Sequence, residues 1–152
     1  MKKILLGVMS VIMLAGICSA DPFFKLSLWE KTALPSDDAV SGIEFGIGSD
    51  TSKVKGLAWN FLYGKTENVK GVQLAFINWS NTFLGFEWGA ANFNEGHIDG
   101  VQMGFFNRSK SVKGIQFGVV NMTEDMKGIQ IGIANFIKNS SLPFMVIVNA
   151  KF

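Results

Sequence analysis

The sequence predicts an all-β protein, an antiparallel up-and-down meander of about 8–10 short strands that forms a small closed or nearly closed β-barrel. Three observations predict this class. An eight-residue pattern recurs along most of the chain, the pattern alternates between two kinds of side chain, and the last residues read as one more strand. A β-solenoid or an open repeat sheet is the alternative architecture.

The repeat has the form Gly, apolar, Gln, apolar, Gly, apolar, apolar, Asn, and it fills residues 42–149. Period-two alternation with many β-branched and aromatic residues indicates strands, and two glycines per unit disfavour a helix. Successive units start 14 or 15 residues apart, at Gly42, Gly56, Gly71, Gly85, Gly100, Gly114, Gly128 and Leu142.

The segments between the units are polar and short, for example SDTSKV at 49–54 and RSKSVK at 108–113. Their composition is typical of turns, and a parallel neighbour needs a crossover of about a dozen residues or more. Successive strands are therefore expected to pair antiparallel. A solenoid is less favoured because 14 residues is short for a coil, whose repeats usually run to about 20 or more.

The two faces of each strand differ in chemistry. One face carries apolar residues such as Val72, Leu74 and Phe76, and the other carries glycine, an amide or carboxylate, and a second small residue. Because glycine weakens a strand interior, its repetition favours a crowded interior over a solvated surface. We expect a polar layer inside the barrel and the apolar face outside, in lipid. The predicted layer contains Glu44, Gln73, Glu87, Gln102, Gln116 and Gln130.

The asparagine that closes most units is interpreted as a strand-to-turn residue. It also creates sequons at Asn78, Asn107 and Asn121, which we attribute to the repeat and not to glycosylation. Aromatic residues at or beyond the ends of the units fit either a membrane-interface girdle or ordinary hairpin packing. These aromatic residues are Tyr63, Trp79, Phe93 and Phe136.

The first 20 residues have the pattern of a secretory signal peptide: Lys2 and Lys3, an apolar run, and small residues before Asp21. Lipidation of Cys18 is an alternative, disfavoured because bulky Ile17 precedes the cysteine. The expected organisation is a signal peptide at 1–20 and a single β-repeat domain at 21–152. Export to the outer membrane or cell surface follows, with the periplasm as the alternative.

Charge and chemistry exclude several functions. Removing Lys2 and Lys3 from 14 basic residues leaves 12, which balances 12 acidic residues and argues against nucleic-acid binding. No nucleophile–base pair is evident, and Glu44 with Glu87 is the only carboxylate pair that invites an acid–base interpretation. The single histidine, His97, lies near Glu95 and Asp99, which is insufficient for an ordinary metal site. No enzyme activity, cofactor or metal is expected.

The chain ends with a segment that alternates at period two, with Phe144, Val146, Val148, Ala150 and Phe152 on one face. It resembles the C-terminal strand of bacterial outer-membrane barrels, which is read by the barrel-assembly machinery. That resemblance implies membrane lipid and this machinery as partners. Two features oppose a barrel. The repeat register puts Phe144, Val146 and Val148 on the Gln/Gly face, and a strand at 23–29 gives an odd strand count.

Tandem units such as GVQMGFFN at 100–107 resemble those of a bacterial surface-repeat family of unknown function. The resemblance covers residues 42–149 and implies an exported, surface-associated protein without catalytic residues. The sequence thus leads to a non-enzymatic protein with a structural, adhesive or binding role at the outer membrane or cell surface. The alternative is a soluble periplasmic β-domain that binds a small ligand or a protein on its Gly/Gln face.

Overall fold

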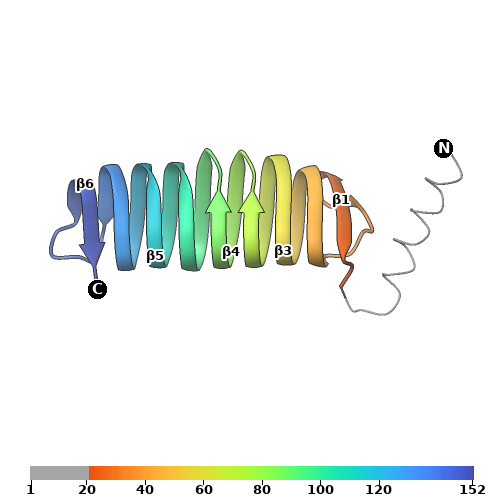
Figure 1. Cartoon of the computed structure of the whole chain (residues 1–152), viewed down its shortest axis with the longest axis horizontal. Helices are drawn as coiled ribbons and strands as arrows, with labels where there is room; N and C mark the ends of the chain where they lie inside the picture. The colour runs from red at the N-terminus through yellow and green to blue at the C-terminus, as the bar shows by residue number, and fades with distance from the viewer. Residues whose placement is uncertain (1–20) are drawn as a thin grey trace, which may run out of the picture.

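The computed structural model describes residues 21–152, so the signal peptide expected at 1–20, with Cys18, lies outside the described residues. The chain winds into an elongated coil in which each turn stacks on the one before (Figure 1). Six strands make one sheet in the order β2-β1-β3-β4-β5-β6. Their bounds are β1 Phe24–Trp29, β2 Thr32–Leu34, β3 Ala39–Leu74, β4 Ile77–Trp88, β5 Ala91–Ile137 and β6 Phe144–Lys151.

The predicted all-β class is confirmed, but the predicted antiparallel meander is wrong. β3 pairs with β4, and β4 with β5, in parallel. Gly71 lies beside Gly85, and Gly85 beside Gly100, so the leading glycine of one repeat neighbours the leading glycine of the next. One repeat is therefore one coil of a β-solenoid, the architecture that the sequence analysis kept as its alternative.

The polar spacers explain the error. Residues 49–54 and 108–113 are not hairpin turns, because they remain extended within β3 and β5. They form the return wall of the coil, and the next repeat then starts one strand spacing further along the axis. The sheet also remains open, with β2 and β6 at its two edges, which corrects the closed barrel.

The leading glycines mark the position where each coil meets the one before it. They have positive φ angles, for example 136° at Gly114, which L-residues rarely adopt. A Cβ atom on Gly114 would overlap the carbonyl oxygen of Gly100, and each leading glycine from Gly56 to Gly128 has the same relation to its predecessor. Glycine at this position therefore allows the coils to stack.

The larger apolar cluster of the interior is a column built from the spacers and not from the repeat units. Its side chains are nearly or completely buried and form one cluster: Val69, Phe83, Ile98, Val112, Met126 and Ile137. Val40, Val54 and Ala58 form a second cluster towards the N-terminal end. The rest of the interior is lined largely by polar side chains.

The C-terminal strand β6 pairs antiparallel with β5, and this removes the register conflict. Phe144 lies opposite Phe136 and Val148 opposite Ile131, both outward-facing, whereas Asn149 lies opposite the inward-facing Gln130. Reversal of the strand direction thus returns the apolar residues to the outer face.

No helix within residues 21–152 has the length and hydropathy needed to cross a membrane.

Candidate functional site: the apolar face and the polar interior

The outward side chains divide the solenoid into two halves. The apolar face is formed by two columns of outward residues, one on each side of an inward position. The first column is Phe45, Trp59, Leu74, Trp88, Met103, Phe117 and Ile131, and the second is Ile47, Phe61, Phe76, Ala90, Phe105, Val119 and Ile133. Many of these side chains are largely exposed, among them Phe105 at 71% and Ile133 at 70%.

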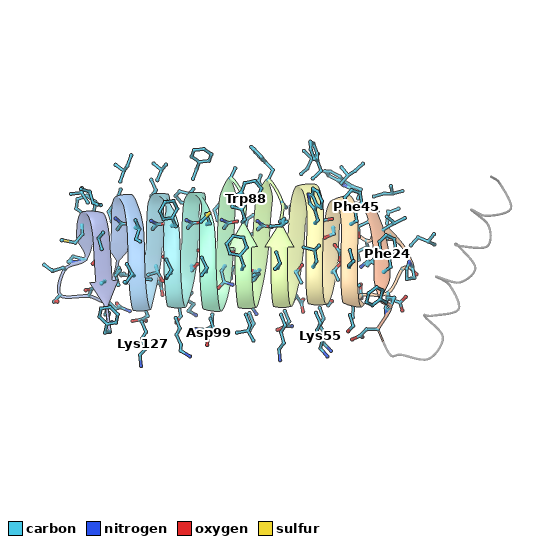
Figure 2. The ribbon with its side chains drawn as sticks, viewed as in Figure 1. Phe24, Phe45, Lys55, Trp88, Asp99 and Lys127 are labelled. Atoms are coloured by element: carbon cyan, nitrogen blue, oxygen red, sulfur yellow. The ribbon has the colours of Figure 1, made fainter. Side chains whose placement is uncertain are left out.

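The polar half carries ion pairs between successive coils. Lys65 contacts Asp50 at 3.0 Å, Lys113 contacts Asp99 at 2.9 Å, and Lys138 contacts Glu124 at 3.3 Å. The hydrogen bond and charge of Asp50 raise the pKa of Lys65. Figure 2 shows aromatic and aliphatic side chains along one edge of the coil and Lys55, Asp99 and Lys127 along the opposite edge.

A groove of about 810 Å³ runs along the apolar face between its two columns. Its walls include Trp59, Trp88 and Phe105, and Asn60 is the one polar side chain that lines it. Asn60 is buried and already donates hydrogen bonds to Glu44 Oε1 and Ser49 Oγ. The groove therefore offers apolar surface and almost no hydrogen-bonding groups to an occupant.

The structure places the six residues of the predicted polar layer inside the coil, where all six are fully buried: Glu44, Gln73, Glu87, Gln102, Gln116 and Gln130. Gln130 Nε2 donates to Gln116 Oε1 at 2.7 Å, and Gln116 Nε2 donates to Gln102 Oε1 at 2.8 Å. Gln102 Nε2 then donates to Glu87 Oε2 at 2.8 Å. These side chains form a directed ladder that ends on a carboxylate.

The burial of this layer also bears on the alternative in which the Gly/Gln face binds a ligand. The Gln and Glu side chains of the repeat have no exposed surface, so they cannot contact an external ligand. Glu44 and Glu87 do not form a catalytic pair either, because they are three coils apart, roughly 14 Å at the usual strand spacing.

The two carboxylates have different environments. Glu44 Oε2 accepts a hydrogen bond from Thr51, whose hydroxyl also accepts one from buried Lys25. Glu87 accepts from Ser80 and Gln102 and has no cationic partner among residues 21–152. Burial raises the pKa of Glu87 to about 7, although both hydrogen bonds act to lower it.

A second ladder was missed by the sequence analysis. The closing asparagines do not leave the strand for a turn, since Asn78, Asn92, Asn107, Asn121 and Asn135 are all fully buried. Each of the first four donates from Nδ2 to Oδ1 of the next at 2.8 Å, in the opposite direction to the glutamine ladder. The strict recurrence of asparagine at one position was the signal that could have revealed it.

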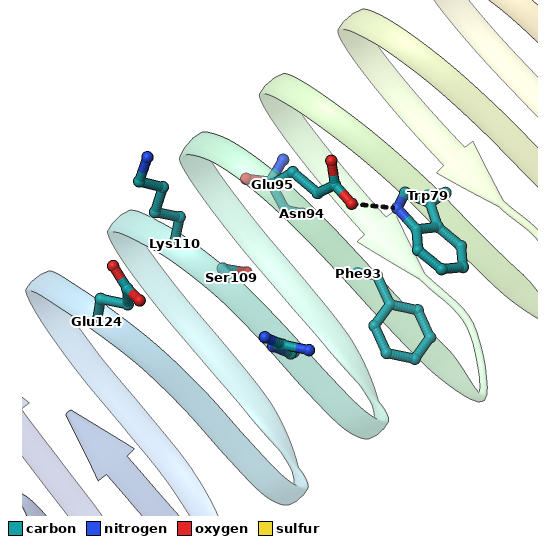
Figure 3. Close-up of a pocket in the computed structure, with 8 residues that line it drawn as sticks. Trp79, Phe93, Asn94, Glu95, Ser109, Lys110 and Glu124 are labelled. Carbon is teal, nitrogen blue, oxygen red and sulfur yellow. Dashed lines mark hydrogen bonds between the residues drawn. The ribbon is translucent and has the colours of Figure 1, made fainter. Parts of the chain in front are cut away.

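A smaller pocket of about 290 Å³ lies on the polar half (Figure 3). The rings of Trp79 and Phe93 stack with centroids 4.9 Å apart, and Trp79 Nε1 donates to Glu95 at 3.2 Å. Arg108 and Lys110 supply cationic groups to its lining. Three of the four aromatic residues singled out at the strand ends lie on this half at equivalent positions of the coil: Trp79, Phe93 and Phe136.

The remaining candidates are brought to no common site. His97 is exposed, and its Nδ1 lies 3.1 Å from Ser111 Oγ. No group of three or more potential metal ligands occurs within the described part of the chain. Comparison of the chain with family models, curated proteins and solved structures found no match.

Proposed function

We propose that the protein is an exported, non-enzymatic, surface-associated β-solenoid that attaches to a lipid membrane through its apolar face. The one-sided distribution of outward side chains carries this proposal. Soluble monomers rarely expose contiguous apolar patches above a few hundred Å², and larger ones mark protein or membrane contacts. Here apolar columns extend over seven coils on one half, while ion pairs occupy the other.

The mode of attachment differs from the barrel expected initially. The solenoid lies along the membrane with the apolar face inserted, as amphipathic interfacial elements do, and the polar half stays in water. Its backbone groups are paired between coils, so the face exposes few unsatisfied hydrogen-bonding groups to lipid. The role is structural or adhesive, and the resemblance to bacterial surface-repeat proteins supports a location at the outer membrane or cell surface.

Flotation with lipid vesicles tests the proposal. The wild type should float with vesicles, and Met103→Lys and Leu74→Lys should each reduce the floated fraction. A lipid-facing lysine costs from about 0–1 kcal/mol near the interface to roughly 2–4 kcal/mol at the bilayer midplane. Ser111→Lys on the polar half is the matched control and should float as the wild type does. Equal flotation of all four proteins, or none by the wild type, would contradict membrane attachment through this face.

The pocket beside Trp79 supports a second candidate function, binding of a small polar ligand at the polar half. It combines stacked aromatic rings with acidic and basic side chains, a composition suited to a ligand that has both apolar and hydrogen-bonding groups. Trp79 fluorescence would report occupancy in a ligand titration. This candidate replaces the Gly/Gln face as the binding surface of a periplasmic domain.

A further inference from the structure

The edge strands at the two ends of the solenoid differ in length and in the residues that flank them. At the N-terminal end the edge strand β2 has only three residues, with Glu30 and Lys31 before it and Pro35 after it. Short length, charge and proline are the usual means by which an edge is protected against pairing. This edge is therefore a poor template for another strand.

At the C-terminal end the edge strand β6 has eight residues and lacks such protection over most of its length. Five consecutive apolar residues are exposed: Phe144, Met145, Val146, Ile147 and Val148. Among residues 21–152, β6 pairs with β5 alone, so the backbone groups on its other edge have no strand partner. A long, exposed, hydrophobic edge strand is a template for a further strand.

The inward side of β6 is also uncovered. Met145 and Ile147 lie opposite the inward-facing Asn135 and Gly132 of the last coil, yet they are 37% and 71% exposed. Ile147 has a φ of 71°, in the left-handed region that a β-branched residue rarely adopts. Strained residues persist mainly where function requires them.

We infer that β6 pairs antiparallel with β6 of a second copy of this chain, about a twofold axis perpendicular to the apolar face. The properties of the two edge strands identify the partner strand as β6. A head-to-tail contact would instead pair β6 with β2 of the second copy, and β2 is short and flanked by charged residues. A twofold contact needs only β6 itself, the same patch on both subunits. Met145 and Ile147 of the two copies would then cover one another.

The twofold arrangement also extends the apolar face. An axis perpendicular to this face leaves both solenoids with their apolar columns on the same side, so the dimer presents one continuous surface of doubled length. This advantage rests on the proposed membrane attachment, whereas the pairing of the β6 edges does not. The two proposals can therefore fail separately.

Light scattering coupled to size-exclusion chromatography in mild detergent tests the inference. The wild type should have the mass of two chains. Ile147→Lys should have the mass of one chain, since an inward-pointing charge on an edge blocks strand pairing. Phe105→Lys is the matched control, since it places a lysine at a site of the same 71% exposure in the coil of residues 100–107, away from β6, and it should remain dimeric.

Circular dichroism should show unchanged strand content in both variants, and Met145→Lys should repeat the result if Ile147→Lys does not fold. A monomeric wild type, or a dimer that survives both edge substitutions, would overturn the inference. A dimer lost in Phe105→Lys but kept in Ile147→Lys would place the contact on the apolar face and overturn it as well. Flotation measured on the same variants reports separately on membrane attachment.

Discussion

At Glu87 the amide ladder has a carboxyl group in place of the glutamine amide. It occupies a glutamine position, accepts from Gln102 and Ser80, and is stacked directly on Gln73, whose Oε1 is buried without a hydrogen-bond partner. A protonated carboxyl can donate a hydrogen bond, which an ionised one cannot. Burial of the carboxyl away from water is the main reason why folding favours the protonated acid and raises the pKa of Glu87 from 4.5 to about 7.

Stability should consequently fall as pH rises. The folded pKa lies above the unfolded one, so the folded state binds more protons between pH 4.5 and about 7, and the free energy of unfolding decreases through this window. The shift corresponds to about 3 kcal/mol. Urea unfolding of Glu87→Gln at pH 8 should show a gain of this order, with the gain vanishing near pH 4.5. Exposed Glu67→Gln is the control, and an equal gain there would refute the assignment.

At the scale of the element, the polar ladders hold neighbouring coils together, a role that an apolar core has in most domains. Asn107 accepts from Asn92 and donates to Asn121 Oδ1 and to the carbonyl oxygen of Phe117 at 3.0 Å. Buried hydrogen-bond networks of this kind are strong when complete and costly when broken, because the orphaned groups cannot reach water. The asparagine column thus fixes the spacing and register of neighbouring coils.

Asn107→Ala should therefore destabilise the fold by about 2–4 kcal/mol. It removes both the oxygen that accepts a hydrogen bond from Asn92 and the nitrogen that donates one to Asn121. Thermal or urea unfolding measures the change. Asn68→Ala, at an exposed position, should stay within about 0.5 kcal/mol of the wild type. A small loss at Asn107 would show that water or a neighbouring amide replaces the missing side chain.

The strands and their recurrence could be predicted from the sequence, whereas their pairing could not be settled from spacer length. Polar gaps of about six residues predict hairpins, but Ser49 and Thr51 within one such gap are buried. The inward column of Val69, Val112 and Met126 recurs within those gaps and indicates a second wall. The Gly and Gln rows indicated a crowded interior, and their glutamine side chains are buried.

The asparagine column and the properties of β6 depend on information that one repeat does not contain. An asparagine reads equally as a turn residue or as a ladder residue until the pairing direction is known. For β6, the repeat register assumed that Phe144 to Val148 continue parallel to the earlier units. The chain reverses instead, through the loop at 138–143, and the side chains change face.

At the scale of the whole molecule, the solenoid reverses the usual distribution of side chains. Its interior is rich in amides, and one half of its exterior is apolar. This combination is unfavourable in water alone and favourable at a boundary between water and lipid. Three of the four tryptophans sample both halves, since Trp59 and Trp88 belong to the apolar face and Trp79 to the polar half.

Quenching of tryptophan fluorescence by brominated lipids is the most direct test of the membrane orientation. In variants that keep one tryptophan and replace the others with phenylalanine, vesicles of brominated lipid should quench Trp59 and Trp88 strongly and Trp79 weakly. Equal quenching of Trp79 and Trp88, or none at Trp59 and Trp88 in vesicle-bound protein, would contradict the account that the apolar face of the solenoid lies in the membrane.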